Sequence, residues 1–188
     1  MSNIDKIELF KKETIKFNKK HNLISKKNTS KIIDEAIEEA TVLTKHLKQH
    51  KNILDIGTGS GLPGIPLAIF NENKNIYLSE KSNKKNYHLK KTIKLLEIEN
   101  ATTIGSANKN TKINKKVDCV VTKAFASTKK TIDIANSFLE KPFTLMLLKG
   151  KLKTINKEIA EANISKENYE IIKIENEKEK HILKIQNE

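Results

Sequence analysis

Hydrophobic and polar residues alternate along the chain in a pattern that predicts an α/β protein. Within residues 1–50 the apolar side chains recur at helical spacing, so this segment is predicted to be helical. Beyond it, short apolar runs alternate with amphipathic stretches. We predict strands at about 53–56, 75–80, 101–104, 117–122 and 143–148, and helices at about 64–70, 83–97, 128–140 and 151–163. This alternation implies a parallel sheet with right-handed crossovers.

The C-terminal part of the chain has a different pattern. Residues 169–175 and 181–186 each alternate apolar and polar positions, and a charged turn separates them. Two such segments predict an antiparallel hairpin, so we expect a mostly parallel seven-stranded sheet that ends in this hairpin. The 188 residues suffice for one α/β domain with a small extension. We assign residues 1–50 to an N-terminal helical cap and residues 51–188 to one compact domain.

A glycine-rich segment joins the first predicted strand to the helix that follows it. The run at 53–56 is apolar apart from Asp55, four glycines follow within residues 57–64, and Pro66 falls in the expected first helical turn. Glycine can adopt a positive φ and leaves no Cβ between the backbone and a ligand. The helix N-terminus behind the glycines offers free N–H groups and a positive dipole end. We expect the charged or hydroxyl-rich part of a small molecule to bind here.

The identity of this small molecule is open on the glycine pattern alone. Residues 59–64 fit the dinucleotide-binding fingerprint, and Glu80 lies about 20 residues further on, where an acid that binds ribose is expected. NAD and S-adenosylmethionine both meet these requirements. Asp55 favours S-adenosylmethionine because it places a carboxylate near a cationic amino-acid group, and the C-terminal hairpin favours the same cofactor. A carboxylate at a strand end also often just caps the following turn, so Asp55 has a structural alternative.

Further candidate residues lie at the carboxyl ends of the predicted strands, where open α/β sheets bind their ligands. These ends carry the glycine turn, Glu80, Lys123 and Lys149, and the usual strand order brings them to one crevice. Lys123 and Lys149 are candidates for holding a base or a phosphate, with an ordinary solvated lysine as the alternative. Phe125 is a candidate for stacking on a base, with core packing as the alternative.

The charge of the chain indicates a polyanionic partner. The formal net charge is +13, and all 36 basic residues are lysine. A genome rich in A and T explains lysine in place of arginine, but it does not explain the excess over acidic residues. Lysines of the N-terminal segment are candidates for contacts with a phosphate backbone, with a solvated charged face as the alternative: Lys11, Lys12, Lys16, Lys19, Lys20, Lys26 and Lys27.

Several classes of protein are disfavoured. Cys119 is the only cysteine, so no internal disulfide and no cysteine-based methyl relay is expected, and we expect Cys119 to be a small core residue. The five histidines are scattered, so we predict surface or structural roles for them and no metal site. No signal peptide and no stretch of about 18 apolar residues is found, so we expect a soluble, cytoplasmic protein without a membrane partner.

The glycine segment carries a resemblance to a known family. Residues 54–68, Leu-Asp-Ile-Gly-Thr-Gly-Ser-Gly-Leu-Pro-Gly-Ile-Pro-Leu-Ala, resemble the signature of the glucose-inhibited division protein B family. The Leu-Pro-Gly-Ile-Pro extension is far more specific than the bare glycines. Shorter matches lie at 18–25, at 78–80 with Lys84 and Lys85 after it, at 123–127 and at 148–150. The resemblance therefore covers about residues 15–150.

Members of this family are bacterial methyltransferases that act on N7 of a guanine in 16S ribosomal RNA. The resemblance implies a Rossmann-like class I S-adenosylmethionine-dependent methyltransferase fold, S-adenosylmethionine as cofactor, and 16S ribosomal RNA or the small ribosomal subunit as partner of a monomer. Lys123 and Lys149 are expected to position the substrate, and no general base is expected because N7 loses no proton. The implied cofactor contacts are Asp55, Gly57, Thr58, Gly59, Gly61, Leu62, Glu80, Ser106, Ala107 and Lys123.

Some positions depart from the family pattern. Lys123 stands where the family usually has arginine before Ala-Phe, and Ser106 and Asn108 stand where it usually has arginine and glutamate. Residues 31–36 read Lys-Ile-Ile-Asp-Glu-Ala where a His-x-x-Asp-Ser element is expected. Lysine cannot reproduce the two-pronged donor geometry of arginine. Two alternatives therefore stay open: a non-catalytic relative that binds RNA or ribosomes, and a methyltransferase that acts on another RNA or on a small molecule.

Overall fold

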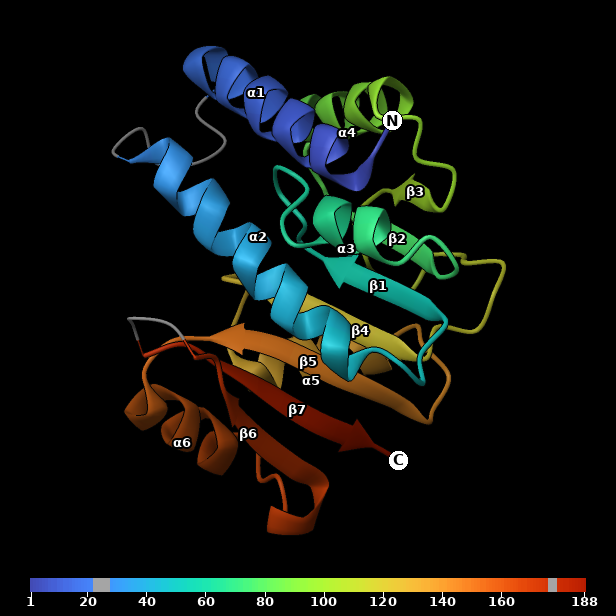
Figure 1. The fold of residues 1–188 in the computed structure, drawn as a ribbon. Helices are drawn as coiled ribbons and strands as arrows, with labels where there is room; N and C mark the ends of the chain where they lie inside the picture. The colour runs from blue at the N-terminus through green and yellow to red at the C-terminus, as the bar shows by residue number, and fades with distance from the viewer. Residues whose placement is uncertain (22–27, 176–178) are drawn as a thin grey trace.

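A seven-stranded sheet forms the centre of the computed structural model, which describes residues 1–21, 28–175 and 179–188 (Figure 1). The strands are β1 (Asn52–Ile56), β2 (Asn75–Ser79), β3 (Ala101–Ile104), β4 (Cys119–Lys123), β5 (Phe143–Lys149), β6 (Tyr169–Lys173) and β7 (His181–Asn187). Their order in the sheet is β3-β2-β1-β4-β5-β7-β6. The first five strands pair in parallel, whereas β7 runs antiparallel to β5 and to β6. The predicted mostly parallel sheet with a closing antiparallel hairpin is confirmed.

The helices follow the predicted alternation, with shorter ends than predicted. They are α1 (Asn3–His21), α2 (Thr29–His46), α3 (Gly64–Phe70), α4 (Asn83–Leu95), α5 (Thr128–Asn136), α6 (Leu152–Glu161) and the short 3₁₀ helix η1 (Lys166–Asn168). Helix α4 ends early because Glu97 takes a φ of 51°, which lets the Ile98 amide bond back to the Ile93 carbonyl at 3.1 Å. The left-handed residue closes the helix as glycine usually does.

One other local prediction needs correction. The strand predicted from residue 117 begins two residues later, at Cys119. The chain enters the sheet at Asp118, whose amide donates to the Asn52 carbonyl at 3.0 Å. Helix α2 begins after Asn28, whose backbone has a φ of 62° and whose side chain makes no capping hydrogen bond.

The alternation of side chains along each strand divides the core into two layers. On one face Ile53, Cys119 and Met146 pack with helices α1 to α4 in one apolar cluster. On the other face Leu54 and Leu145 pack with α5 and α6 in a second cluster. The fully buried central strands therefore read as nearly continuous apolar runs, as expected for a parallel sheet covered on both sides.

The N-terminal helices belong to the first of these layers. Phe10 of α1 and Ile33 and Leu43 of α2 are fully buried, and they share a cluster with Ile53 of β1. Figure 1 shows α2 lying diagonally across the face of the sheet, with α1 beside it. Helix α2 thereby packs with α3 and covers part of this face of the sheet. The division of the chain at residue 50 stays a prediction.

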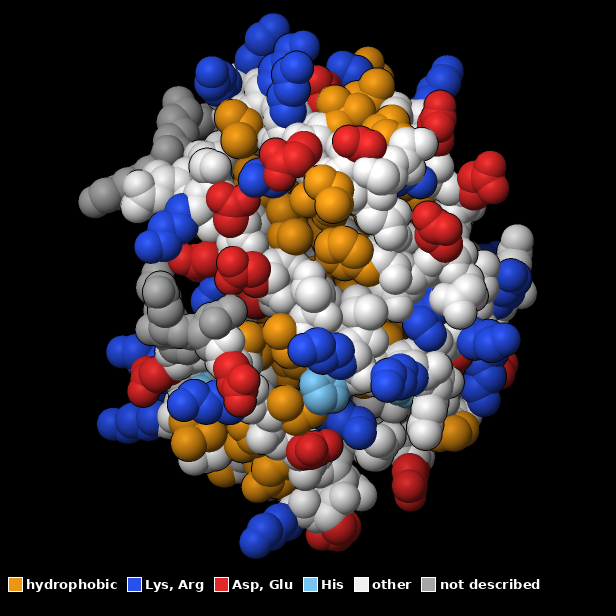
Figure 2. Space-filling model, in the orientation of Figure 1, with side chains coloured by type: hydrophobic (Ala, Val, Ile, Leu, Met, Phe, Trp, Pro, Cys, Tyr) orange, Lys and Arg blue, Asp and Glu red, His pale blue; other side chains and the backbone are white. Residues whose placement is uncertain are grey.

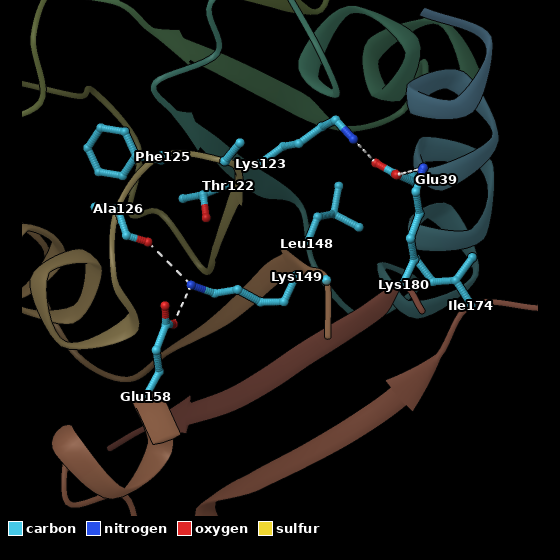
Figure 3. A pocket seen from close by; sticks show the side chains of 12 residues that line it. Glu39, Thr122, Lys123, Phe125, Ala126, Leu148, Lys149, Glu158, Ile174 and Lys180 are labelled. Atoms are coloured by element: carbon cyan, nitrogen blue, oxygen red, sulfur yellow. Dashed lines mark hydrogen bonds and ion pairs between the residues drawn. The ribbon is translucent and has the colours of Figure 1, made fainter. Parts of the chain in front are cut away.

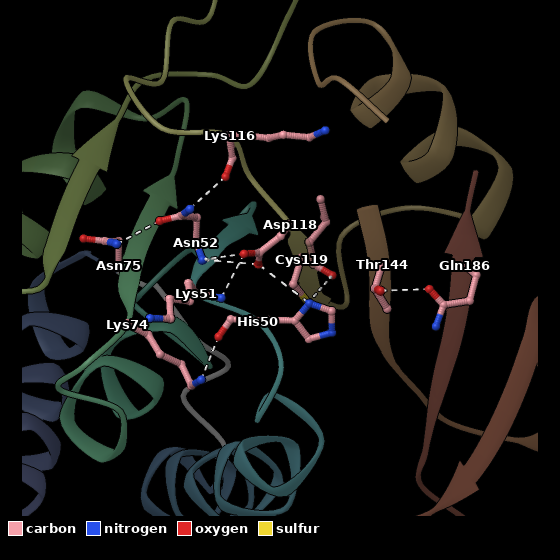
Figure 4. A network of polar contacts seen from close by, with 11 residues as sticks. His50, Lys51, Asn52, Lys74, Asn75, Lys116, Asp118, Cys119, Thr144 and Gln186 are labelled. Carbon is pink, nitrogen blue, oxygen red and sulfur yellow. Dashed lines mark hydrogen bonds and ion pairs between the residues drawn. The ribbon is translucent and has the colours of Figure 1, made fainter. Parts of the chain in front are cut away.

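A polar network closes the edge of the sheet where β1 and β4 begin (Figure 4). The Asp118 carboxylate accepts hydrogen bonds from the backbone amides of Lys51, at 2.9 Å, and Asn52, at 3.2 Å. The His50 Nδ1 atom lies 3.7 Å from the same carboxylate, and burial lowers the pKa of His50 although the Asp118 charge opposes that shift. Asp118 thus fixes the register of two neighbouring strands far from their carboxyl ends.

Replacing Asp118 with alanine is expected to lower the free energy of unfolding by about 1–3 kcal/mol, because two backbone donors lose their acceptor. Urea denaturation measures the change. The matched control is Asp133→Ala, which removes an exposed carboxylate 3.2 Å from Lys129. An exposed pair contributes little, so this control is expected to change stability by less than about 0.5 kcal/mol. Equal effects of the two variants would contradict the role given to Asp118.

Candidate functional site

The glycine turn stands at the centre of the sheet, between the end of β1 and the start of α3. Gly57, Gly59 and Gly61 have φ values of 73°, 60° and 93°, a region that side chains rarely adopt. The Gly57 and Thr58 amides both donate to the Ser79 carbonyl, at 2.9 and 3.0 Å, so the turn is tied to the end of β2. A Cβ at Gly59 would have only the Gly57 carbonyl oxygen within 4 Å. The turn is therefore rigidly held and leaves open space in front of Gly59.

Asp55 lies beneath this turn. Its side chain is fully buried, and its Oδ2 atom accepts a hydrogen bond from the Gly64 amide at 3.0 Å. Burial raises the pKa of Asp55 to about 7 and the Glu80 charge adds to the rise, while Thr58 and the Gly64 amide oppose it. Asp55 thus caps the start of α3, which is the structural role given above as the alternative to cofactor binding. Its contact with a cofactor stays a prediction.

The ends of β2 and β3 stand next to the turn. The Glu80 side chain is 6% exposed; Oε1 accepts from the Ser82 amide at 2.8 Å, and Oε2 lies 3.8 Å from the Lys85 ammonium. The Ser79 hydroxyl donates to the Gly105 carbonyl at 2.9 Å and accepts from the Ala107 amide at 3.0 Å. Ser79 therefore holds the predicted Ser106–Ala107 segment at the same edge of the sheet as Glu80.

The remaining predicted cofactor residues are largely covered by protein. Thr58 is 2% exposed, and Leu62 is 8% exposed and packs in the core cluster that includes Leu89. The side chain of Leu62 therefore serves the core. The turn offers a ligand mainly its backbone, as the glycine pattern predicts.

A cavity of 360 Å³ opens at the carboxyl ends of β4 and β5 (Figure 3). It is also bounded by α2, α6 and the β6–β7 hairpin, so segments that are far apart in the sequence form its walls. Its volume lies at the lower end of the range of about 300–1,000 Å³ that is typical of ligand sites. The residues that line it are Glu39, Thr122, Lys123, Ala124, Phe125, Ala126, Leu148, Lys149, Gly150, Glu158, Ile174 and Lys180.

The lysines of this cavity are paired with glutamates. Lys123 forms a short ion pair with Glu39 of α2, which also lies 2.6 Å from the Lys180 ammonium. The Lys149 Nζ atom donates to Glu158 Oε2 at 2.6 Å and to the Ala126 carbonyl at 3.3 Å. The alternative of an ordinary solvated lysine therefore does not hold for Lys123 or Lys149. Their contacts with a substrate stay predictions.

Phe125 links the cavity to the glycine turn. Its ring lies against Gly57 so closely that a Cβ at Gly57 would be 2.3 Å from the Phe125 Cδ2 atom. Phe125 as a whole residue is 37% exposed, and the preceding Ala124 has a φ of 50°. A left-handed alanine costs about 1 kcal/mol or more, and such strain concentrates at functional sites. Phe125 is neither a core residue nor a free side chain, and its stacking on a base stays a prediction.

Sequence reasoning missed three charged residues of the cavity: Glu39, Glu158 and Lys180. Glu39 carried a detectable signal, because it lies next to Ala40 and three residues after Ala36, within the apolar stripe of α2. A carboxylate in a buried stripe needs a partner, and here Lys123 and Lys180 supply it. Glu158 stands at a polar position of the amphipathic helix α6, and Lys180 lies in the charged segment before β7, so no local pattern distinguished them.

The residues predicted to be structural are structural. Cys119 is fully buried in the core, and burial raises the pKa of its thiol. His88 is 2% exposed and stacks on Phe17 with ring centroids 4.3 Å apart, and burial lowers its pKa to about 4. His181 Nδ1 lies 2.8 Å from the Gly150 carbonyl oxygen. Among the described residues, no group of three or more His, Cys, Asp or Glu side chains is arranged to hold a metal ion.

The lysines of the N-terminal helices share their face with acidic residues. Figure 2 shows blue and red side chains interspersed over α1 and α2, without one continuous basic patch on this face. Lys11 lies 2.8 Å from Asp34, whereas Lys12, Lys19 and Lys20 are exposed. Lys26 and Lys27 lie outside the described residues. The predicted phosphate contacts of this segment stay predictions. No helix in the described part of the chain combines the length and apolar character needed to cross a membrane.

Comparison with known proteins places these features in a family. The model of the GidB family, described as rRNA small subunit methyltransferase G, matches residues 3–183. The chain belongs to this family. A GidB relative, the ribosomal RNA small subunit methyltransferase G of Brachyspira hyodysenteriae, is 35% identical over 194 residues, which cover 97% of this chain and 94% of that protein. The protein of the same name from Photobacterium profundum is 32% identical over 78% of this chain and 69% of its own length.

Solved structures support the fold of this GidB protein. The AdoMet complex of M. jannaschii TYW2 has a TM-score of 0.57 at 20% identity and covers 80% of this chain and 74% of its own. The tRNA (m1A58) methyltransferase TrmI of Aquifex aeolicus has a TM-score of 0.59 at 14% identity, with 80% and 69% covered. The predicted Rossmann-like methyltransferase fold is confirmed.

Gly59 offers a direct test of the turn as the site for S-adenosylmethionine, the cofactor that the sequence predicts. Gly59→Val and Gly59→Asn are both expected to abolish binding in calorimetry, because either side chain enters the open space in front of the turn. Asparagine tolerates a positive φ better than valine does, so Gly59→Asn is expected to keep a thermal midpoint close to that of the wild type. Cofactor binding by Gly59→Asn with wild-type affinity would contradict this placement.

Asp55 gives a pH-dependent prediction. Its pKa is about 7 in the folded protein and about 3.9 in an unfolded chain, so the folded state favours the protonated form. The stability that comes from protonated Asp55 is complete below pH 4 and is lost as the pH rises to about 7. Asp55→Asn lacks this titration, and its stability relative to the wild type is expected to rise by about 2.5 kcal/mol between pH 5 and pH 8. Urea denaturation without cofactor measures the difference, and a pH-independent difference would contradict it.

Proposed function

We propose that this protein transfers a methyl group from S-adenosylmethionine to N7 of a guanine in 16S ribosomal RNA. Membership of the GidB family over residues 3–183 supports the reaction. The observation that carries the proposal is the placement of the glycine turn beside the 360 Å³ cavity, with Phe125 in contact with both. A cofactor on the turn and a base in the cavity would be neighbours.

The residues around the turn fit the cofactor. The open space in front of Gly59 lets the cofactor lie directly against the backbone of the turn. Glu80, which follows the neighbouring strand β2, accepts hydrogen bonds from the ribose hydroxyls. The Ser106–Ala107 segment stands at the same edge for the adenine. Asp55 stays beneath the turn and holds it in place through Gly64.

The chemistry makes few demands on acid–base groups. S-adenosylmethionine supplies an activated methyl group on a sulfonium, and guanine N7 offers an in-plane lone pair that carries no proton. No general base is needed, and alignment of the two reactants supplies several kcal/mol of the catalysis. Lys123 and Lys149, held by Glu39 and Glu158, line the space in which the base is aligned.

The net charge of +13 suits a ribosomal RNA partner, either naked or in the small subunit. Exposed lysines attract the phosphate backbone, so binding weakens as salt is added. This substrate places the reaction in the cytoplasm. We propose a monomer, because the turn and the cavity are built from one chain.

The test is methylation of small-subunit RNA that lacks N7-methylguanosine. Wild-type protein with S-adenosylmethionine is expected to produce N7-methylguanosine at one position, detected by nucleoside mass spectrometry and mapped by cleavage at the modified base. Lys123→Met is expected to lower kcat/KM by about 100-fold, because a partly buried charge near the cofactor and the base is lost. The control Lys129→Met removes an exposed lysine of α5 and is expected to have wild-type activity.

Three outcomes distinguish the alternatives. Cofactor and RNA binding without turnover by the wild type would favour the non-catalytic relative. A methylated base other than guanine, or methylation only of another RNA, would favour a different substrate. Absence of cofactor binding would contradict the enzyme itself.

A further inference from the structure

Glu158 of α6 is held in an unusual way for a surface glutamate. Its Oε2 atom accepts three hydrogen bonds: from the Thr128 hydroxyl at 2.6 Å, from the Thr128 amide at 3.1 Å and from the Lys149 ammonium at 2.6 Å. Its side chain is only 17% exposed. The contacts of Glu158 with described residues all end on Oε2, so Oε1 keeps its lone pairs in the cavity.

Glu158 is ionised at neutral pH. Burial acts to raise its pKa, but hydrogen bonds from Lys149 and Thr128 outweigh this effect and hold the pKa below its ordinary value. An ionised carboxylate accepts hydrogen bonds and donates none. Glu158 lines the cavity, and its Oε1 atom, which makes no hydrogen bond to a described residue, is available there as a charged acceptor.

Lys149 presents a donor beside this acceptor. Its ammonium bonds to Glu158 and to the Ala126 carbonyl, which leaves a third N–H group. Ala126 follows Phe125, whose ring covers Gly57, and Figure 3 shows the Lys149 ammonium between Ala126 and Glu158. Along the loop that leads from Phe125 into the cavity, Ala126 holds the Lys149 donor and Thr128, two residues further on, holds the Glu158 acceptor. We infer from this order along the loop that the donor lies nearer to the glycine turn than the acceptor.

This order matches one purine. Along the edge of guanine that starts at N7, O6 accepts a hydrogen bond, and N1–H and the 2-amino group then donate. Adenine presents a donor next to N7 and an acceptor after it, which is the opposite order. Of the two purines of unmodified RNA, only guanine can therefore satisfy both groups when its N7 is directed toward the turn.

We propose that Glu158 and Lys149 read the Watson–Crick edge of the target guanine. Lys149 donates to O6, and Glu158 Oε1 accepts from N1–H and the 2-amino group. This inference rests on the proposed function and adds that Glu158, together with Lys149, determines which base is methylated. Reading this edge requires the base to be unpaired, so the target guanine is extruded from any helix or lies in a single-stranded segment.

The test compares guanosine with inosine at the mapped target nucleotide of an otherwise identical RNA. Inosine keeps N7, O6 and N1–H and lacks only the 2-amino group. Wild-type protein is expected to methylate the guanosine RNA with a kcat/KM at least tenfold higher than the inosine RNA. Glu158→Gln is expected to lower kcat/KM for guanosine at least tenfold and to reduce the preference over inosine to less than threefold. The Kd for S-adenosylmethionine is expected to stay within twofold of the wild type.

Two control variants separate recognition from structure. Glu161→Gln changes an exposed glutamate of the same helix, which lies 3.7 Å from the Lys157 ammonium, and is expected to match the wild type. Thr128→Val removes one donor to Glu158 Oε2 and keeps the carboxylate, so it is expected to preserve the preference for guanosine. Thermal midpoints show whether each variant folds.

Two results would overturn the assignment. If Glu158→Gln slows both RNAs equally and keeps the wild-type preference, the role of Glu158 is structural. If Glu158→Gln has wild-type rates on both RNAs, Glu158 does not contact the base. Failure of the proposed function has a different signature, since the wild-type protein then produces no N7-methylguanosine from the guanosine RNA.

Discussion

The hydrogen bond between the buried Asp55 carboxylate and the Gly64 amide fixes the geometry on which the site depends. It joins the last part of the central strand β1 to the first residue of α3. Any residue other than glycine at position 64 would place a Cβ 2.7 Å from Asp55 Oδ2 and 2.2 Å from Leu78 Cδ2. The turn above is therefore compact, and Ser79 holds it from the neighbouring strand. The protein tolerates a buried carboxylate with a raised pKa because this contact shapes the turn.

The elements that sequence predicts best are those whose pattern is local. Three such elements are close together in the sequence: the apolar run of β1, the glycines and the start of α3 at Gly64. Each could be predicted from the residue types at its own positions. Helix ends were predicted less well, because Glu97 and Asn163 take left-handed conformations that neither residue type demands. Those conformations arise because a return hydrogen bond, such as Ile98 to Ile93, outweighs a weak local preference.

The cavity was predictable only in part, because its ion pairs join distant segments. Lys123 and Lys149 are the last residues of β4 and β5, so the sequence could place them at the carboxyl ends of the strands. Their partners Glu39 and Glu158 lie on helices that pack there only in the folded protein, and 84 residues separate Glu39 from Lys123. No sequence pattern specifies which glutamate meets which lysine. Lys123 and Lys149, which were predicted to hold a base or a phosphate, are each paired with a carboxylate in the cavity.

The pairing of cavity lysines with glutamates separates two tasks of a basic protein that acts on RNA: attachment to the RNA and choice of the base. The excess of positive charge lies outside the cavity, on exposed lysines such as Lys12, Lys19 and Lys20, and such charges attract any polyanion. Inside the cavity Lys149 and Glu158 form a donor and an acceptor with little net charge. Salt screens the first group strongly, whereas partly buried pairs are screened much less. Added salt should therefore weaken the attachment of RNA while the choice of base, made by hydrogen-bond geometry, is kept.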